Sequence, residues 1–266
     1  MSVTAPQGFR AAGVAAGLKD DGARDVAVVV NDGPSRAAGA VFTTAGDKAA
    51  PVLWSEQVVS GGRVRAAVLT SGGANAGTGP PGFQDVHAQA EHTADLLTDS
   101  AAEVVLCATG SVGTRPPLDA LRQGVTAALA EASRGGGLAA ADAIRTTDTV
   151  VKIAFRRGDG YTVGAMAKGP DPSLSTALCV LTTDADITAD QCRRLLSAAA
   201  GKTLDPLSAT NDTVLLMASG ASGTTPDEDA LAALLTEVLA ELATQIGADT
   251  PATDTPATDH DRAQNS

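Results

Sequence analysis

The stretch "AMAKGPDPSLSTALCVLTTDADI", residues 165–187, joins a lysine, two prolines and a Ser-Thr pair to an apolar run. Prolines oppose strand pairing and β-branched residues favour it, so the pattern predicts a loop that becomes a buried strand near Ala177. Ser175 and Thr176 therefore lie at the junction of loop and strand. Hydroxyls at such a junction most often only shape the backbone, and the rest of the sequence decides whether these two carry chemistry.

Short runs rich in β-branched residues recur between glycine-rich turns. Each run has the length and composition of a buried strand. The expected strands lie at 25–30, 65–70, 103–108, 149–155 and 213–219. Amphipathic stretches at 83–97 and 117–132 alternate with them and predict helices. The predicted fold class is therefore α/β or α+β.

One helix near the carboxyl end has clear start signals. Thr225 is expected to cap it, Pro226 suits its first turn, and Glu228 completes a capping box before an apolar stripe. The composition changes at residue 250 to a twice-repeated TPATD followed by polar residues. Such a segment has no apolar surface to offset the entropy of ordering it, so we expect residues 250–266 to be a disordered tail.

Composition excludes several classes of partner. The chain has 266 residues, of which 44% are hydrophobic, enough for one large core or two medium ones. A net charge of -12 and an aromatic content of 2% argue against nucleic-acid binding. We expect no membrane partner, because no apolar run appears long enough to span a bilayer. The three cysteines are widely spaced and form no CxxC pair, which favours a reducing cytoplasm and predicts neither disulfides nor a metal site.

Peptide cleavage would give the Ser-Thr pair a chemical role. An internal threonine lacks a guaranteed base and is a poor nucleophile. If the bond between Ser175 and Thr176 breaks, the new α-amine, with an ordinary pKa near 8, can accept the proton of the Thr176 Oγ. The β-branch also restricts χ1 and holds Oγ in place. One residue then carries both nucleophile and base.

Two other threonine-containing stretches leave their roles open. "CATGSVG", residues 107–113, follows a strand and puts Thr109-Gly110 at its end, where backbone N–H groups can face a developing oxyanion. A Thr-Gly turn is also common without any function. "RTTDT", residues 145–149, equally suits a helix cap or a strand surface.

Taken together, the blocks of this sequence resemble a known family. The relevant blocks include "VTAPQGFRAAGVAAGLK", "VNDGPS", "SGGANAGTGPPGFQD", "ATGSVG", "TTDTVVK", "VGAMAKG", "VLTTDADI" and "TNDTVLLMASGASG". In this order they resemble the ornithine acetyltransferases, the bifunctional glutamate N-acetyltransferases of the cyclic arginine pathway. The resemblance runs from Val3 to about Asp249. It implies a layered fold of mixed sheets and helices that processes itself to expose an N-terminal threonine nucleophile.

The resemblance also implies how the chain is divided. The family precursor cuts itself before the threonine that begins its β chain, and Thr176 falls on that position, with Ser175 before the cut. Residues 1–175 would then form an α-chain-like region and residues 176–249 a β-chain-like region. We expect the two pieces to remain together as an α/β hetero-oligomer.

Site roles follow from the same resemblance. Thr109 and Gly110 would form the oxyanion hole, while Lys168 with Thr146 or Thr147 would hold the amino-acid substrate. Thr176 would take acetyl from N-acetylornithine and pass it to glutamate in a ping-pong reaction, with acetyl-CoA as a further candidate donor. The resemblance implies no cofactor and no metal.

Family members continue beyond the helix that ends near Asp249, so we expect a C-terminally truncated member with impaired acetyl transfer. Two alternatives remain open at this point. One is a catalytically inactive homologue that binds a small molecule or acts as a partner subunit. The other is an amidohydrolase with the same N-terminal-nucleophile chemistry, in which water replaces the amine acceptor.

Overall fold

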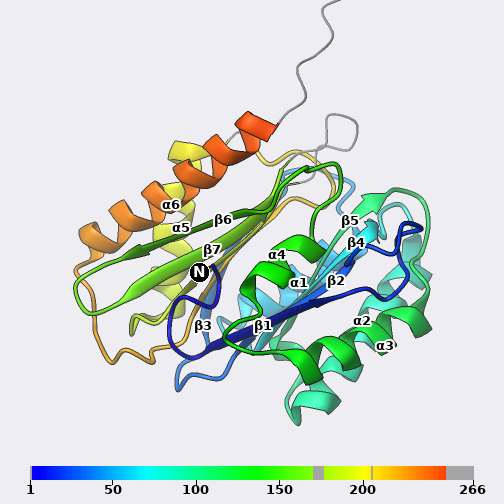
Figure 1. The fold of residues 1–266 in the computed structure, drawn as a ribbon, viewed down its shortest axis with the longest axis horizontal. Coiled ribbons are helices and arrows are strands. Elements are labelled where there is room, and N and C mark those ends of the chain that lie inside the picture. The colour runs from blue at the N-terminus through cyan, green and yellow to red at the C-terminus, as the bar shows by residue number, and fades with distance from the viewer. Residues whose placement is uncertain (1, 170–176, 205, 250–266) are drawn as a thin grey trace, which may run out of the picture.

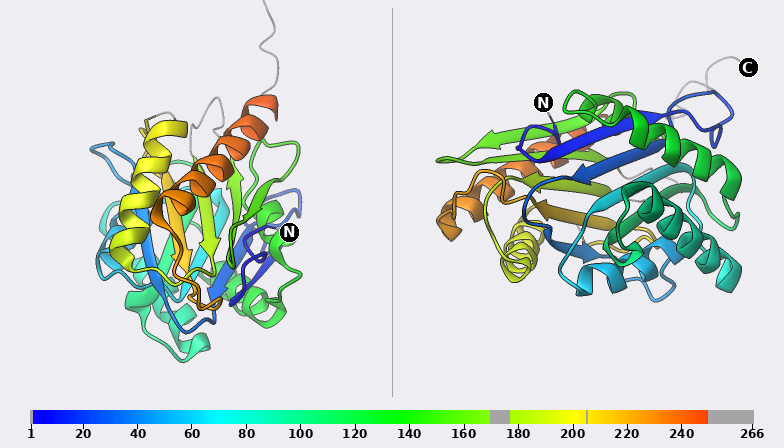
Figure 2. Two further views of the ribbon diagram at one scale, coloured as in Figure 1. Left: turned by 90° about the vertical axis from the view of Figure 1, so that its left-hand side faces the viewer. Right: turned by 90° about the horizontal axis from the view of Figure 1, so that it is seen from below.

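The protein is built from two stacked sheets between layers of helices (Figure 1). The computed structural model describes residues 2–169, 177–204 and 206–249. The order of the layers, from one side to the other, is helices, sheet, sheet and helices. Figure 2 shows the same layering from two further directions, with α5 in yellow and α6 in orange on one outer side.

The first sheet contains four strands in the order β1-β2-β4-β5. Their bounds are β1 Phe9–Val14, β2 Val26–Asn31, β4 Ala66–Gly73 and β5 Val104–Ser111. β2 pairs antiparallel with β1 and β4, whereas β4 and β5 run parallel. The carboxyl ends of β4 and β5 therefore meet at one edge of this sheet.

The second sheet contains five strands in the order β3-β9-β8-β7-β6. Their bounds are β3 Ala37–Phe42, β6 Lys152–Arg157, β7 Thr162–Lys168, β8 Leu178–Thr183 and β9 Thr213–Ala218. β8 and β9 run parallel, and the other neighbours are antiparallel. The strand β8 is the apolar run after Thr176, and it lies in the middle of the sheet.

Helices cover the outer faces of both sheets. α2 (Gly79–Leu97) and α3 (Leu118–Glu131) pack on the first sheet, and α5 (Ala189–Thr203) and α6 (Glu228–Asp249) pack on the second. α1 (Ala50–Ser60) contacts β5, and α4 (Gly137–Ala143) contacts β1 and β2. A short 3-10 helix, Ala101–Glu103, leads into β5.

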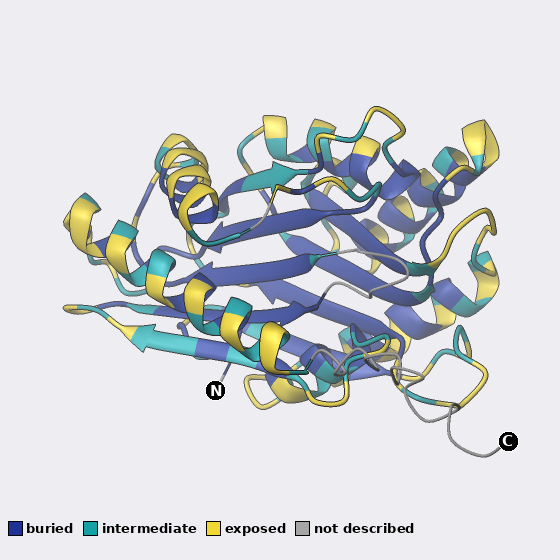
Figure 3. Cartoon of the chain, turned by 90° about the horizontal axis from the view of Figure 1, so that it is seen from above, coloured by how far each residue is buried: buried dark blue, intermediate teal, exposed yellow. Residues whose placement is uncertain are grey.

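The alternation of side chains along β8 explains why its sequence is apolar throughout. Leu178 and Val180 belong to the core between the two sheets, whereas Cys179 and Leu181 belong to the core under α5 and α6. Successive side chains of a strand point to opposite faces, so a strand covered on both faces needs apolar residues at every position. In Figure 3 the strands are mostly buried, and the exposed residues lie on the outer helices and loops.

The predicted strands and helices are present, with ends that differ by a few residues. β1, β3 and β7 were not predicted, because their alanine and glycine residues give little strand propensity. The predicted capping box at Thr225 is wrong. α6 begins at Glu228, and Asp227 Oδ1 accepts a hydrogen bond from Ala230 N at 2.9 Å. The carboxylate directly before the helix is in the better capping position, and Glu228 contacts Arg194 instead.

α6 differs from the expectation that no apolar segment is long enough for a bilayer. Among the described helices it is the one whose length and composition would suit a membrane span. Its residues Leu231, Leu235 and Leu242 are buried in the core against the second sheet. Length and composition alone are weak evidence for a membrane span, and α6 packs its buried face on the second sheet as an outer helix of the fold. The predicted tail, residues 250–266, lies outside the described residues.

Candidate active site

The end of β5 brings Thr109 and Gly110 against the end of β4. Thr109 pairs with Ser71 and Gly110 with Gly72 in the parallel register. Gly110 has a φ of 117°, which side-chain-bearing residues rarely adopt, and an added Cβ would lie 2.6 Å from the Gly72 carbonyl carbon. Glycine is therefore required at position 110 both for its backbone conformation and for the close approach of the two strands.

The outer edge of β5 is covered by side chains rather than by another strand. Ser55 Oγ donates to Leu106 O at 2.7 Å and accepts from Leu106 N, and Asn211 Nδ2 donates to Ala108 O at 2.9 Å. Alternate residues of a strand turn their backbone groups to the same edge, so Gly110 N–H is next in this series. That orientation suits a donor to an oxyanion.

Lys168 reaches Thr109 from the other sheet. It is the last residue of β7, where it pairs with Leu178, and it is 1% exposed. Its Nζ donates to Thr109 Oγ1 at 3.3 Å, and Thr109 is fully buried. Because Thr109 Oγ1 accepts this bond, its own O–H remains a donor for another group. The predicted oxyanion and substrate residues are thus in direct contact.

Asp148 links the predicted threonine loop to the residue after Lys168. Its Oδ1 accepts from Gly169 N at 2.9 Å and from Lys152 Nζ at 2.8 Å, and its Oδ2 accepts from Thr146 N at 3.2 Å. Burial raises the pKa of Asp148, but these hydrogen bonds outweigh it and hold the pKa below its ordinary value. The carboxylate therefore stays charged and fixes two parts of the site together.

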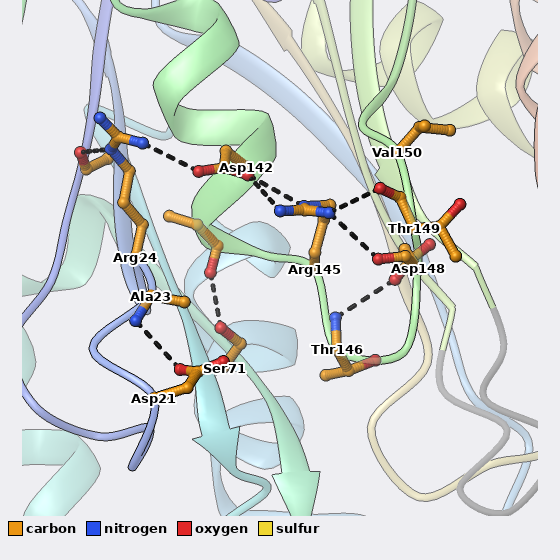
Figure 4. A network of polar contacts seen from close by, with 12 residues as sticks. Asp21, Ala23, Arg24, Ser71, Asp142, Arg145, Thr146, Asp148, Thr149 and Val150 are labelled. Atoms are coloured by element: carbon orange, nitrogen blue, oxygen red, sulfur yellow. Dashed lines mark hydrogen bonds and ion pairs between the residues drawn. The ribbon is translucent and has the colours of Figure 1, made fainter.

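The last residue of α6 closes this cluster. Asp249 accepts from Lys152 Nζ and from Thr149 N, the second at 2.8 Å. The hydrogen bond and charge of Lys152 and the bonds from Thr149 lower the pKa of Asp249. Arg145 also donates to Asp148 O and Thr149 O, as Figure 4 shows. The loop is therefore held from the helix, the strand and its own backbone.

The two candidate substrate threonines differ in their surroundings. Thr146 Oγ1 is buried and has no hydrogen-bond partner among the described residues, whereas Thr147 is exposed. A buried hydroxyl without a partner loses free energy relative to one in water, so a ligand that bonds to Thr146 would recover it. Figure 4 places Thr146 at the turn of the loop, with its N–H aimed at Asp148.

The predicted cleavage pair, Ser175 and Thr176, lies outside the described residues. Ala177, which follows directly, is held firmly at the start of β8. Its N–H donates to Asp212 Oδ1 at 2.7 Å, and its carbonyl accepts from Thr213 N at 3.0 Å. The backbone after the predicted cut is therefore fixed by Thr213, the first residue of β9, and by Asp212, which directly precedes that strand.

Thiol chemistry does not compete with a hydroxyl nucleophile here. Cys107, Cys179 and Cys192 are free and buried. Burial raises the pKa of each thiol to about 12, so none supplies a thiolate near neutral pH. Cys107 lies only two residues before Thr109, yet it acts as a core residue of β5.

Residue patterns identified only part of this site. The structure brings Lys168 into contact with Thr109, beside Gly110, and links Thr146 to Gly169 through Asp148. The carboxylates, the lysine and the amide that hold these residues were not predicted. Those residues are Asp148, Lys152, Asn211, Asp212 and Asp249. They occur inside the blocks "TTDTVVK" and "TNDTVLLMASGASG" or at the end of α6, and their hydrogen bonds to groups distant in the sequence are visible only in the fold.

A model of the ArgJ family matches residues 10–255. The chain belongs to the ArgJ family. The arginine biosynthesis bifunctional protein ArgJ of Thermobifida fusca is 63% identical over 94% of this chain and 67% of its own length. The Streptomyces coelicolor ArgJ protein is 52% identical over 92% of this chain and 66% of its own length. The chain thus spans about two thirds of the length of these ArgJ relatives.

Solved structures agree with the assignment to the ArgJ family. The ornithine acetyltransferase of Mycobacterium tuberculosis, complexed with ornithine, is 50% identical with a TM-score of 0.63, covering 66% of this chain and 96% of that one. ArgJ from Bacillus halodurans is 27% identical with a TM-score of 0.54, covering 68% and 87%.

A more distant structure shows the fold alone. The L-aminopeptidase D-Ala-esterase/amidase of Ochrobactrum anthropi, described as a variant of the Ntn hydrolase fold, is 14% identical with a TM-score of 0.57. The match covers 92% of this chain and 85% of that one. The predicted layered fold of the N-terminal-nucleophile type is therefore confirmed. This likeness does not favour the amidohydrolase alternative, because it concerns only the fold.

Proposed function

We propose that this ArgJ chain transfers acetyl from N-acetylornithine to glutamate through an acyl-enzyme on Thr176. The observation that carries the proposal is the buried contact between Lys168 Nζ and Thr109 Oγ1. It joins a cation to a candidate oxyanion donor at the ends of strands from two different sheets. Lys168 also pairs with Leu178, which lies two residues after Thr176 in the sequence.

The first proposed step is self-cleavage between Ser175 and Thr176. Thr176 Oγ attacks the Ser175 carbonyl, the peptide C–N bond breaks to leave an ester, and water hydrolyses the ester. Residues 1–175 and 176–249 then form separate chains, with 250–266 as a tail on the second. The α-amine released at Thr176 becomes the base for turnover.

Acetyl transfer then takes two similar half-reactions. Thr176 Oγ attacks the acetyl carbonyl of N-acetylornithine while its proton passes to the Thr176 α-amine. Gly110 N–H and Thr109 O–H donate to the oxyanion, the acetyl C–N bond breaks, and the α-ammonium returns its proton to the leaving ornithine nitrogen. The glutamate amine next attacks the acyl-threonine by the reverse proton route and leaves as N-acetylglutamate.

Substrate binding is assigned to Lys168 and Thr146 or Thr147. The partnerless hydroxyl of Thr146 favours this residue over Thr147. The charge of Lys168 suits an α-carboxylate, and its contact with Thr109 gives it a second role in the reaction. Acetyl-CoA remains a candidate donor, and no cofactor enters these steps. The free, buried cysteines support a cytoplasmic location.

The test is a direct assay of the purified chain. N-acetylornithine and glutamate are supplied, N-acetylglutamate is measured, and the intact mass of the protein is followed over the same period. We expect two fragments that begin at Met1 and Thr176, together with N-acetylglutamate formation at a lower rate than a full-length family member gives. Thr176→Ala should give neither product, whereas Thr176→Ser should cleave and retain part of the activity.

The outcomes separate the proposed function from its alternatives. N-acetylornithine consumed without N-acetylglutamate, with acetate as product, would indicate an amidohydrolase. A folded chain that binds ornithine in calorimetry but stays uncleaved and inactive would indicate an inactive homologue. Either result would overturn the transferase assignment.

A further inference from the structure

Two adjacent residues, Asn211 and Asp212, contact both segments that the proposed reaction must bring together. Asn211 contacts the end of β5, which carries Thr109 and Gly110. Asp212 contacts Ala177, which follows Thr176 in the chain. We propose that Asn211 and Asp212 are positioning residues that fix the spacing between the oxyanion donors and the nucleophile. The catalytic part of this inference rests on the proposed function.

Asn211 holds two strand ends with one side chain. It is 1% exposed, and its Nδ2 donates to Ala74 O at 2.7 Å and to Ala108 O at 2.9 Å. A carboxamide has two N–H donors on its nitrogen, and both are used here on carbonyl oxygens. Ala108 directly precedes Thr109, so any movement of Asn211 displaces the first oxyanion residue.

Asp212 holds the beginning of β8 in the same way. It is 3% exposed, its Oδ1 accepts from Ala177 N at 2.7 Å, and its Oδ2 accepts from Ala209 N at 2.9 Å. A buried carboxylate whose two oxygens each accept from a backbone N–H is held in one orientation, because turning it would break both bonds. The nitrogen of Ala177 belongs to the peptide group of Thr176, so Asp212 acts one bond away from that residue.

The backbone that carries both side chains is itself anchored. Ala49 N donates to Thr210 O at 3.0 Å, and Thr43 N donates to Asp212 O at 3.0 Å. The two side chains therefore extend from a fixed segment in two directions, and covalent geometry sets the distance between the groups they hold. Catalysis by an oriented nucleophile is sensitive to such spacing, since a displacement of about 1 Å costs roughly a hundredfold in rate.

The chain offers matched controls for both residues. Asn31 is fully buried, and its Nδ2 also donates to two carbonyls, Ser35 O and Ala218 O, both at 3.1 Å. Asp184 is 2% exposed and accepts from Gln7 N at 2.9 Å and Thr162 N at 2.7 Å. Neither Asn31 nor Asp184 contacts β5 or Ala177. Replacing either residue by alanine therefore removes similar hydrogen bonds at a place outside the proposed site.

The kinetic test compares Asn211→Ala and Asp212→Ala with Asn31→Ala and Asp184→Ala. In the folded fraction of each protein we expect the two site variants to lower kcat and the self-cleavage rate about a hundredfold, with KM within about twofold. Both controls should lower Tm and leave kcat unchanged. If an alanine variant does not fold, Asn211→Ser and Asp212→Asn, which can each keep one of the hydrogen bonds, should give smaller losses in kcat.

A second measurement does not depend on activity. Hydrogen exchange of the Ala177 amide is followed by NMR in the full chain, with Val180 in the middle of β8 as reference. Asp212→Ala should accelerate exchange at Ala177 at least tenfold and leave Val180 unchanged, while Asp184→Ala should change neither. Equal exchange in all three proteins would overturn the positioning role.

The two measurements distinguish failure of this inference from failure of the proposed function. An active wild-type protein with unchanged kcat in folded Asn211→Ala and Asp212→Ala would overturn the inference alone. An inactive, uncleaved wild type would overturn the proposed function. In that case the exchange rate of the Ala177 amide still tests whether Asp212 holds the start of β8. Faster exchange in Asp212→Ala would support this role, and unchanged exchange would overturn it.

Discussion

Lys168 Nζ donates to Thr109 Oγ1 across the boundary between the two sheets, although the residues are 59 positions apart in the chain. Thr109 belongs to β5 of the first sheet and Lys168 to β7 of the second. The packing of one sheet on the other therefore sets the geometry of the candidate oxyanion hole. Core residues between the sheets contribute to the site although they touch no substrate.

Removing either partner of this contact should weaken catalysis through the same hydroxyl. We expect Thr109→Val and Lys168→Met each to lower kcat about a hundredfold, because an oxyanion donor is lost or loses its polarising cation. Thr109→Ser, which keeps the hydroxyl, should retain most of the activity. Steady-state kinetics at saturating N-acetylornithine measures these values.

The double variant tests whether the two residues act together. If Lys168 works through Thr109, Thr109→Val combined with Lys168→Met should lose little more kcat than either change alone. Additive losses would show independent roles. In that case a rise in KM for Lys168→Met alone would identify it as the residue that binds the substrate carboxylate.

Gly110 should be intolerant of alanine for two separate reasons. The φ of 117° is strained for alanine, and the new Cβ would lie 2.6 Å from the Gly72 carbonyl carbon. We expect Gly110→Ala to lower the free energy of unfolding by about 2–4 kcal/mol. Gly113 is the matched control, because its φ is 88° and an added Cβ meets nothing within 4 Å. Gly113→Ala should cost only about 1 kcal/mol in urea unfolding, and equal losses would remove the steric explanation.

Some strands could be identified from sequence and others could not. β8 and β2 are covered on both faces and read as unbroken apolar runs. β1 and β3 contain glycines that permit close packing: a Cβ on Gly13 would lie 1.9 Å from Ala139 O, and one on Gly39 would lie 2.5 Å from Arg193 N. Close tertiary packing requires these small residues. Because glycine and alanine have low strand propensity, the sequence of β1 and β3 does not indicate a strand.

The candidate site also contains some residues that the sequence identified and others that it did not. The position of Thr109 and Gly110 at a strand end left their role open. Their assignment and that of Lys168 depended on the whole order of sequence blocks, which resembles a family. Asn211 and Asp212 act on backbone atoms 103 and 35 residues away. A hydrogen bond from a side chain to a distant carbonyl or N–H leaves no periodicity or composition in the sequence.

The ion pairs of Lys152 with Asp148 and Asp249 should make the thermal stability of the protein depend on pH. The pKa values of Asp148 and Asp249 lie below their ordinary value of 3.8, so the folded protein binds fewer protons there than the unfolded chain. Their contribution is complete above about pH 5 and declines as pH falls toward their folded pKa values. Thermal unfolding from pH 7 to pH 3 should therefore show a falling Tm.

Lys152→Met isolates this effect. At pH 7 it leaves two half-buried carboxylates without their cation, and Tm should fall. At pH 3 both carboxylates are closer to neutral, so the difference from wild type should narrow. Lys48→Met removes the more exposed pair with Glu56 and should change Tm little at either pH. If the difference in Tm between wild type and Lys152→Met is the same at pH 7 and pH 3, the electrostatic explanation is wrong.

The two threonines of the 146–149 loop should differ in substrate binding. Thr146 Oγ1 is buried without a partner among the described residues, and Thr147 is exposed. Thr146→Val should raise KM for N-acetylornithine roughly tenfold, since a hydrogen bond to a charged or polar ligand contributes about 1–3 kcal/mol. Thr147→Val should leave KM within about twofold. A larger effect at Thr147 would reverse the assignment.

The two products of self-cleavage should remain one particle, because the cut lies between neighbours in a sheet. β7 and β8 flank the cleavage position and share six register pairs, from Val163↔Thr183 to Lys168↔Leu178. β9, from the second fragment, also pairs with β3 from the first. Separation would expose both the strand edges and the core between the sheets, which is strongly unfavourable in water. In size-exclusion chromatography the cleaved protein should elute as one peak at the volume of uncleaved Thr176→Ala, and the fragments should separate only in denaturant. Two peaks in native buffer would show that sheet pairing across the cut does not hold the chains together.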